Sequence, residues 1–379
     1  MRHTAPTTYD TREDAEAWLT DERRLISAGT WAPPAVRRAE RDAAARASTF
    51  ASFTDYATAW IEERRVKGRP LAAKTRDHYT DLLGRYLTPA FGTLPIDQIT
   101  PEVVSEWYDA FKPAGSRKGN RAKGKDAGAT ARAHTYSFGR AVMNTAISAH
   151  GPLVGRVNPF AIRGGGSSPG RRREELATAE EVKVMLATIR PDWRALIELG
   201  LWTGLRYGEI VGLRRADIDL TRRVVRVRYS IARTKSEGVI QKGTKSDAGE
   251  RDQRIPANLV PVLLDHLKNH VAKGRTALLF PSATGKHLAP SAFYGKPLKS
   301  GGNGWYAARE AAGHPSLHFH DLRATGATLF AQQGATEAEI MAWLGDSTPQ
   351  AAQRYVRAAR SRMDMLTNKM SEVATAGEW

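Results

Sequence analysis

Three separated segments in the C-terminal half of the chain carry side chains suited to phosphate chemistry. Arg206 lies in the sequence TGLRYGEI, Arg323 ends the sequence HDLR, and Tyr355 ends the sequence LGDSTPQAAQRY. Guanidinium groups bind the non-bridging oxygens of a phosphate, and an activated hydroxyl can attack the phosphorus in line. The combination predicts cleavage of a phosphodiester by a tyrosine while two arginines neutralise the charge that develops.

Two further residues belong to this pattern. His320 precedes Arg323 by three positions, which places both on one helix face and puts a proton carrier beside a guanidinium. Glu209 follows Arg206 by three positions and can orient that arginine. Taken singly, each residue has a commoner structural role: Arg206 and Glu209 as a surface ion pair, Tyr355 as a packing side chain. The joint occurrence in one chain order makes the chemical interpretation specific.

Composition narrows the class of protein. The 379 residues include 57 Lys and Arg against 40 Asp and Glu, a formal charge of +17, which indicates a polyanionic partner. That partner is usually nucleic acid, and less often an anionic membrane or an acidic protein. The sequence has no cysteine, which excludes disulfide scaffolds, thiolate metal sites and cysteine nucleophiles. No window approaches a membrane-spanning length of uncharged apolar residues, so no membrane partner is expected.

The length predicts more than one domain, and the apolar fraction of 41% is enough for real cores. Residues 1–48 are charged and alanine-rich, with a helix start at Thr11. Residues 49–155 carry apolar side chains at helical spacing and predict a small all-helical domain, in which Thr100-Pro101-Glu102 is a strong helix start. We expect a basic linker over residues 156–176, a second domain over 177–360 and a tail over 361–379.

The second domain is expected to be mainly helical with a small antiparallel β-sheet. Thr178 and Glu181 form a capping box, and further helices follow over about 192–202 and near Arg206. Residues 223–230 alternate valine with polar residues and predict one strand, with Val239-Ile240 and Arg254-Ile255 as candidate partner segments.

Two stretches concentrate positive charge outside these elements. The polar stretch 112–126 and the glycine-rich linker either are solvated segments or bind DNA phosphates, and the two interpretations are compatible. The candidate phosphate-binding residues are Arg117, Lys118, Arg121, Lys123, Lys125, Arg171, Arg172 and Arg173.

The tail carries one apolar helical stripe. Met363, Leu366, Met370 and Val373 recur at helical spacing. The stripe either packs on its own domain or docks on a neighbouring protomer.

The chain resembles the tyrosine recombinases, specifically the phage-type integrases of actinobacterial phages and prophages, over roughly residues 49–360. The resemblance is carried by TGLRYGEI (203–210), GTKS (243–246), RIP (254–256), HDLR (320–323) and LGDSTPQAAQRY (344–355). It implies a helical core-binding domain joined to a mixed α/β catalytic domain, the two together clamping DNA. Residues 1–48 fall short of the arm-binding domain of many such integrases and are either a remnant of it or a substitute for it.

The resemblance also implies a role for each residue. Tyr355 is the expected nucleophile, forming a 3′-phosphotyrosyl bond, and Arg206 and Arg323 bind the scissile phosphate. His320 assists proton transfer, and Lys245, preferred over two nearby lysines, protonates the leaving 5′-oxygen. Glu209 corresponds to the acidic support residue of the family.

One position departs from the family pattern. Asp346 stands where histidine or tryptophan usually donates a hydrogen bond to the phosphate, and an ionised carboxylate cannot donate. Asp346 either caps the next helix, orients Arg323 or His320, or becomes protonated on DNA; we favour the first two.

The expected function is site-specific DNA recombination through a Holliday junction, integrating or excising phage DNA without metal, ATP or any other cofactor. Expected partners are double-stranded attachment sites and a homotetramer on DNA, with a host DNA-bending protein and an excisionase as further candidates, in the cytoplasm of the bacterial host near its nucleoid. Two alternatives stay open: a sequence-specific DNA-binding protein with a weakened active site, and an enzyme like the type IB topoisomerases.

Overall fold

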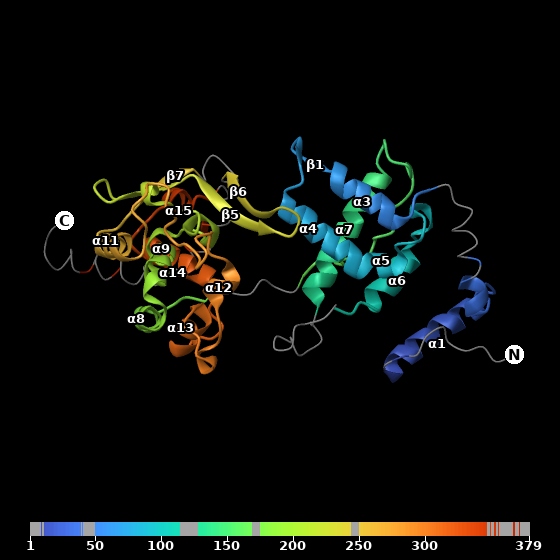
Figure 1. Cartoon of the computed structure of the whole chain (residues 1–379). Helices are drawn as coiled ribbons and strands as arrows, with labels where there is room; N and C mark the ends of the chain where they lie inside the picture. The colour runs from blue at the N-terminus through green and yellow to red at the C-terminus, as the bar shows by residue number, and fades with distance from the viewer. Residues whose placement is uncertain are drawn as a thin grey trace. The chain divides into compact units, whose positions relative to one another are not determined.

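The computed structural model describes residues 9, 11–38, 40, 50–113, 128–168, 175–243 and 250–346, and the single positions 349, 352, 353, 355, 367 and 371. The chain divides into two compact units, Met1–Arg171 and Arg172–Trp379 (Figure 1). Helices predominate in both, with small antiparallel sheets, so the predicted fold class is confirmed. Within the described part of the chain, no helix combines the length and the apolar character needed to cross a membrane.

The described part of the first unit consists of helices and a short hairpin. Its elements are α1 (Arg12–Ser27), α3 (Phe53–Glu63), β1 (Arg65–Val66), β2 (Arg69–Pro70), α4 (Ala73–Leu82), the π-helical turn η1 (Leu83–Leu87), α5 (Thr88–Phe91), the 3₁₀ turn η2 (Ile96–Gln98), α6 (Pro101–Asp109) and α7 (Ala129–Ala146).

Capping side chains set where these helices begin. The Thr11 hydroxyl accepts a hydrogen bond from the Asp14 N–H at 3.1 Å, and the Thr100 hydroxyl accepts one from the Val103 N–H at 3.4 Å. Each cap satisfies an N–H group that has no partner inside its helix. Both helix starts predicted from the sequence are therefore confirmed for α1 and α6.

The helical unit extends past the predicted boundary at residue 155. Phe160 is fully buried and lies against Phe91, Trp107 and Tyr136. Gly165 also packs on this core, since a Cβ there would lie 2.7 Å from the Tyr136 ring. Burial of an aromatic ring outweighs the flexible composition of the segment. The described first part of the predicted linker, residues 156–168, therefore belongs to the first unit.

The second unit surrounds helix α9. Its elements are α8 (Ala179–Thr188), η3 (Pro191–Trp193), α9 (Arg194–Thr203), α10 (Tyr207–Ile210), η4 (Arg215–Asp217), β3 (Ile218–Asp219), β4 (Val224–Val227), β5 (Tyr229–Thr234), β6 (Gly238–Gly243), β7 (Arg251–Arg254), α11 (Leu259–Asn269), α12 (Pro290–Tyr294), η6 (Leu298–Ser300), α13 (Trp305–Ala311), α14 (Phe319–Gln332) and α15 (Glu337–Leu344). The capping box of Thr178 and Glu181 begins α8 as predicted.

The strand predicted over residues 223–230 is divided between two sheets. Strand β4 lies between β3 and β7, with Val227 opposite Arg251, whereas β5 pairs with β6 in a separate hairpin that Figure 1 shows projecting from the helices. Val225 and Val227 are buried in the core, whereas the residues of β5 are only partly buried. The chain therefore changes partner after β4, and the prediction of one continuous strand was wrong.

Helices α9 and α14 approach each other closely because glycine lies between them. A Cβ at Gly326 of α14 would lie 2.0 Å from the carbonyl oxygen of Leu201 in α9. Such a contact requires a residue without a side chain. The close approach brings the C-terminal end of α9 beside α14, and the candidate site is assembled there.

Candidate active site

Arg206 is positioned by the sharp end of α9. Gly204 ends that helix in a left-handed conformation (φ +62°), and a Cβ there would lie 2.4 Å from the Trp343 ring of α15. Arg206 is the N-terminal cap of the short helix α10 rather than a residue inside it. Its backbone N–H donates to Glu209 Oε2 at 3.0 Å, and its Nη1 donates to Glu209 Oε1 at 2.9 Å. The carboxylate of Glu209 thus binds both the backbone N–H and the guanidinium of Arg206.

Glu209 is buried and serves a second arginine. The Nη2 of Arg251, on β7, donates to Glu209 Oε2 at 3.1 Å, and the Glu209 side chain is only 3% exposed. Burial by itself raises the pKa of Glu209, but the Arg251 guanidinium and the Arg206 N–H outweigh burial and hold that pKa below its ordinary range. Glu209 is therefore a buried carboxylate that orients Arg206.

Arg323 projects from α14 into the same region. The helix begins where the His318 N–H donates to Asp321 Oδ2 at 2.7 Å. The Arg323 side chain is 3% exposed, and its Nη1 donates to the carbonyl oxygen of Gly204. Burial, and after it repulsion by Arg206, lowers the pKa of Arg323 to about 10, so the guanidinium is still protonated at neutral pH.

Asp346 joins the two arginines predicted to bind phosphate. Its Oδ1 accepts a hydrogen bond from Nη2 of Arg206, and its Oδ2 accepts one from Nη2 of Arg323 at 2.9 Å. Gly345, in a left-handed conformation, ends α15 just before it, and the Asp346 N–H donates to the Met341 carbonyl at 3.1 Å. The predicted contact of Asp346 with Arg323 is thus present, and Arg206 shares the same carboxylate.

The two remaining catalytic candidates in the described part of the chain differ in exposure. His320 is an exposed residue in the first turn of α14. Tyr355 is 4% exposed and packs in an apolar cluster with Ala324 and Ala327 of α14 and Leu344 of α15. Helix α14 therefore carries Arg323 and His320 and also contributes to the apolar cluster that holds Tyr355.

Two stretches of the chain match models of known protein families. The model of the phage integrase family matches residues 175–362, and the model of the phage integrase N-terminal domain matches residues 1–28. The chain is 39% identical over 372 residues to the prophage phiRv2 integrase of Mycobacterium tuberculosis. The aligned region covers 98% of this chain and 89% of that protein. The chain belongs to the phage integrase family. It is accordingly a tyrosine recombinase, an enzyme of site-specific DNA recombination.

Solved structures show the same fold. The Tn1549 transposon integrase in complex with transposon right-end DNA superposes with a TM-score of 0.64 at 20% identity, over 84% of this chain and all of that chain. A lambda integrase tetramer bound to a Holliday junction gives a TM-score of 0.52 at 16% identity, over 92% of this chain and 88% of that one. The likeness extends over both units of this recombinase.

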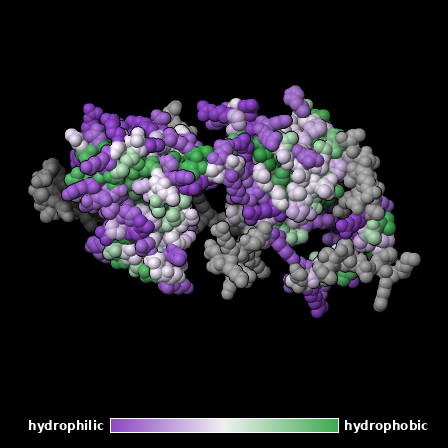
Figure 2. All heavy atoms as spheres, viewed as in Figure 1, coloured by the Kyte–Doolittle hydropathy of each residue, from purple (hydrophilic) through white to green (hydrophobic). Residues whose placement is uncertain are grey.

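Several predicted residues of the recombinase lie outside the described residues, and their expected roles stay predictions. These are Lys245, the residues Arg117, Lys118, Arg121, Lys123 and Lys125 of the polar stretch 112–126, the linker residues Arg171, Arg172 and Arg173, and most of the tail 361–379. On the face that Figure 2 draws, hydrophilic residues predominate over both units. Among the described residues, no group of three or more His, Asp or Glu side chains is arranged to hold a metal ion.

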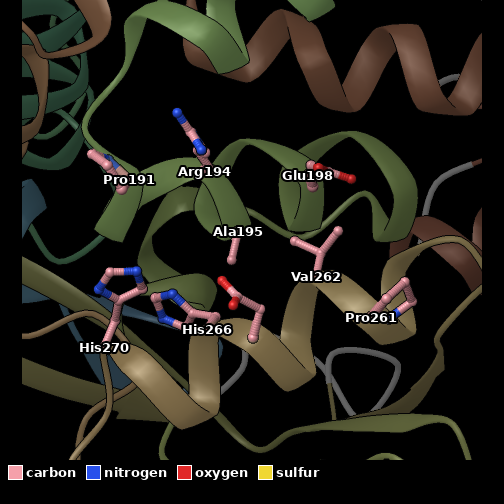
Figure 3. A pocket seen from close by; sticks show the side chains of 9 residues that line it. Pro191, Arg194, Ala195, Glu198, Pro261, Val262, His266 and His270 are labelled. Atoms are coloured by element: carbon pink, nitrogen blue, oxygen red, sulfur yellow. The ribbon is translucent and has the colours of Figure 1, made fainter.

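A cavity of about 340 Å³ between α9 and α11 lies apart from this cluster (Figure 3). Its lining includes Glu198, His266 and His270, and it includes none of the arginines or carboxylates described above. Nε2 of His266 bonds to the Leu279 carbonyl oxygen at 2.9 Å, which ties the ring to the fold. The lining of this cavity thus shares no residue with the arginine–carboxylate cluster.

Sequence reasoning missed Arg251. Its side chain, 9% exposed, lies beside Glu209 and completes a row of alternating charges. In this row Arg251 contacts Glu209, Glu209 contacts Arg206, and Asp346 joins Arg206 to Arg323. No motif marks Arg251, since its place depends on the pairing of β7 with β4. Its position three residues before the sequence RIP (254–256) was the available signal, but the sequence predicted a polar turn there.

Proposed function

We propose that Tyr355 is the nucleophile of this recombinase and that Arg206 and Arg323 bind the two non-bridging oxygens of the scissile phosphate. One observation supports this assignment most directly: guanidiniums from two distant segments converge on the two oxygens of one carboxylate. Two donors that can hold one carboxylate can hold one phosphodiester. Tyr355 packs in an apolar cluster with Ala324 and Ala327 of α14, the helix that carries Arg323.

The reaction follows from these roles. The phenolic oxygen of Tyr355 attacks phosphorus while its proton passes to His320, and the bond from phosphorus to the 5′-oxygen breaks. Lys245 protonates the departing oxygen, which leaves a 3′-phosphotyrosyl bond and a free 5′-hydroxyl. Religation to the 5′-hydroxyl of a second duplex reverses these steps, and the covalent intermediate conserves the energy of the broken bond.

Charge neutralisation is the main contribution of the cluster. The transition state spreads negative charge over the phosphoryl oxygens, and preorganised guanidiniums stabilise that charge without reorganising during the step. Glu209 holds Arg206 on both sides, so the arginine is oriented before DNA arrives. Arg251 keeps Glu209 ionised and in place.

The substrate and assembly are proposed from the same family. The substrate is double-stranded DNA at attachment sites, and the assembly is a homotetramer that passes through a Holliday junction, with the tail 361–379 docking on a neighbouring protomer. The shared fold of the lambda integrase tetramer supports this assembly. A host DNA-bending protein and an excisionase complete the proposed partners, and DNA as substrate implies action in the cytoplasm of the bacterial host.

Trapping the covalent intermediate tests the proposal. The full chain is incubated with a nicked duplex that spans the attachment-site core, so that the short 5′-hydroxyl strand diffuses away after cleavage. We expect a protein–DNA adduct on a denaturing gel from the wild type and none from Tyr355→Phe, which lacks the attacking oxygen.

Tyr306→Phe is a matched control, because Tyr306 is a partly buried tyrosine of the same unit that stacks on Arg309. That variant should form the adduct. An adduct that persists in Tyr355→Phe would move the nucleophile to another residue. Specific DNA binding by a wild type that forms no adduct would favour the alternative of a DNA-binding protein with a weakened active site.

A further inference from the structure

The carboxylate of Asp346 occupies the place where two arginines are expected to receive a phosphate. Each of its oxygens accepts a hydrogen bond from a different guanidinium, Oδ1 from Arg206 and Oδ2 from Arg323. The side chain is 19% exposed, so it is reached by solvent at its edge. Its backbone is tied to the end of α15 through the Met341 carbonyl.

A carboxylate and a phosphodiester make equivalent demands on these donors. Each is a monoanion that presents two oxygen atoms to paired N–H groups. The Nη2 groups of Arg206 and Arg323 that bind Asp346 are therefore those that a phosphate requires. The two anions compete for the same site.

Electrostatics explains why the free protein keeps a carboxylate there. The cluster contains Arg206, Arg251 and Arg323 against Glu209 and Asp346, so three positive and two negative charges leave a net charge of +1. Without Asp346 the same arithmetic, three against one, leaves +2. A buried guanidinium without a partner anion is strongly unfavourable, and Arg323 is the most deeply buried of the cations.

We propose that Asp346 is an internal placeholder for the scissile phosphate, which must be displaced from Arg206 and Arg323 before DNA can be cleaved. This inference rests on the proposed function, because it takes the scissile phosphate as the anion that the two arginines bind. Asp346 keeps the arginines paired and oriented in the free recombinase. It also lowers the affinity of the site for any phosphate that cannot displace it.

The size of this effect follows from the occupancy of the placeholder. When a site is open for only a fraction of the time, its apparent affinity falls by that fraction. A placeholder engaged about nine-tenths of the time lowers phosphate affinity about tenfold. Only a duplex held by many further contacts would then bring its phosphate into the site.

Phosphate binding by the full chain tests the proposal directly. Inorganic phosphate is titrated by calorimetry at neutral pH and constant ionic strength into the wild type and into Asp346→Asn, which keeps the shape of the side chain and removes its charge. We expect the dissociation constant of the variant to be lower by about tenfold or more. With the nicked duplex, the concentration that gives half-maximal adduct formation should fall in the same direction.

Asp192→Asn is the matched control. The Asp192 carboxylate also accepts two hydrogen bonds from an arginine, Arg190, at 3.0 and 2.8 Å, but this pair is at the surface of the same unit. Asp192→Asn removes the same charge as Asp346→Asn, and screening by solvent should limit its effect on phosphate binding to less than about twofold. If Asp346→Asn bound phosphate no more tightly than Asp192→Asn, the placeholder proposal would be overturned.

A second measurement covers the case in which Asp346→Asn does not fold. In the wild type, phosphate should shift the side-chain carboxyl ¹³C resonance of Asp346, assigned by its loss in Asp346→Glu. Phosphate binding that leaves this resonance unmoved overturns the proposal. Neither titration uses Tyr355, so tighter phosphate binding together with no adduct from the wild type would support the placeholder while the proposed nucleophile failed.

Discussion

The first unit gathers aromatic rings around Phe160, whereas the second unit gathers ionised side chains around Asp346. Among the described residues, the interior of the first unit joins rings from α5, α6 and α7, and its buried charge is Glu22, held by Trp31 and Arg37. The second unit buries Glu209, Asp321 and Arg323 beside an apolar core.

The difference indicates a division of work between the units. Apolar burial stabilises a shape at little electrostatic cost. Buried charges require partners and cost desolvation, which is worthwhile where charge must be stabilised during a reaction. We therefore expect substitutions in the first unit to reduce stability, and substitutions of Arg206, Glu209 or Arg323 in the cluster to reduce activity more than stability.

The largest loss of stability is expected from Phe160→Ala. The ring is fully buried, and its removal leaves a cavity between Phe91, Trp107 and Tyr136. The free energy of unfolding of the first unit should fall by about 3–5 kcal/mol. Urea unfolding followed by hydrogen exchange in α7 measures this loss.

Val157→Ala is the control, because Val157 is 86% exposed and close by in the sequence. It should change the free energy by less than about 0.5 kcal/mol. At saturating DNA, the adduct should form from folded Phe160→Ala at the wild-type rate. A much slower rate would contradict the expectation that substitutions in the first unit reduce stability and leave the reaction rate unchanged.

A smaller and pH-dependent loss is expected from Glu209→Gln. The pKa of folded Glu209 lies below the ordinary value of 4.5, so its ionised form stabilises the fold at every pH above 4.5. That stabilisation is lost as pH falls below 4.5 through the folded pKa. At pH 7 the variant should be less stable by about 1–3 kcal/mol, and the difference should shrink in acid.

Urea unfolding at pH 7, 5, 4 and 3 measures this dependence. Glu180→Gln is the control: its carboxylate is 77% exposed beside Lys183, and its loss should have little effect at any pH. If the difference in free energy of unfolding between wild type and Glu209→Gln stayed constant from pH 7 to pH 3, the ionised carboxylate would not be the stabilising species.

The fold could be predicted where local signals decide it. Caps at Thr11, Thr100 and Thr178 set helix starts, because a side-chain oxygen and an N–H lie within one turn of each other. The extension of the first unit to Phe160 could not be predicted, because the glycine-rich composition of the segment indicates a linker. The burial of Phe160 depends on rings that are distant in the sequence. The break between β4 and β5 likewise depends on which face of the core each strand meets.

The candidate site divides in the same way. The pairing of Arg206 with Glu209 follows from their spacing, and it was predicted. The meeting of Arg206, Arg323 and Asp346 depends on the approach of α9 to α14 at Gly326, which no local pattern reveals. The position of Arg251 beside Glu209 depends on the pairing of β7 with β4 alone. Long-range packing thus decides what motif spacing cannot.

The smallest effect for each substitution is expected from the basic strap over residues 112–126, whose cations are predicted to bind DNA phosphates. A clamp with about 8 phosphate contacts gives a log–log slope of affinity against salt near −7, and each contact contributes about 0.9. Replacing Lys118, Arg121 and Lys123 together by glutamine should therefore reduce the slope by nearly 3, measured by fluorescence anisotropy from about 50 to 200 mM salt.

The dependence on salt should differ between the cations of the strap and the ion pairs of the arginine–carboxylate cluster. Exposed cations act on DNA by releasing counterions, so their contribution fades as salt rises, whereas buried pairs are screened much less. Asp346→Asn should consequently lower the duplex concentration for half-maximal adduct formation by a similar factor at low and high salt, whereas the effect of the strap variant should change with salt. A strap variant with an unchanged slope would leave the strap without a role on DNA. An Asp346→Asn effect that vanished at high salt would place that carboxylate among the solvated charges of the surface.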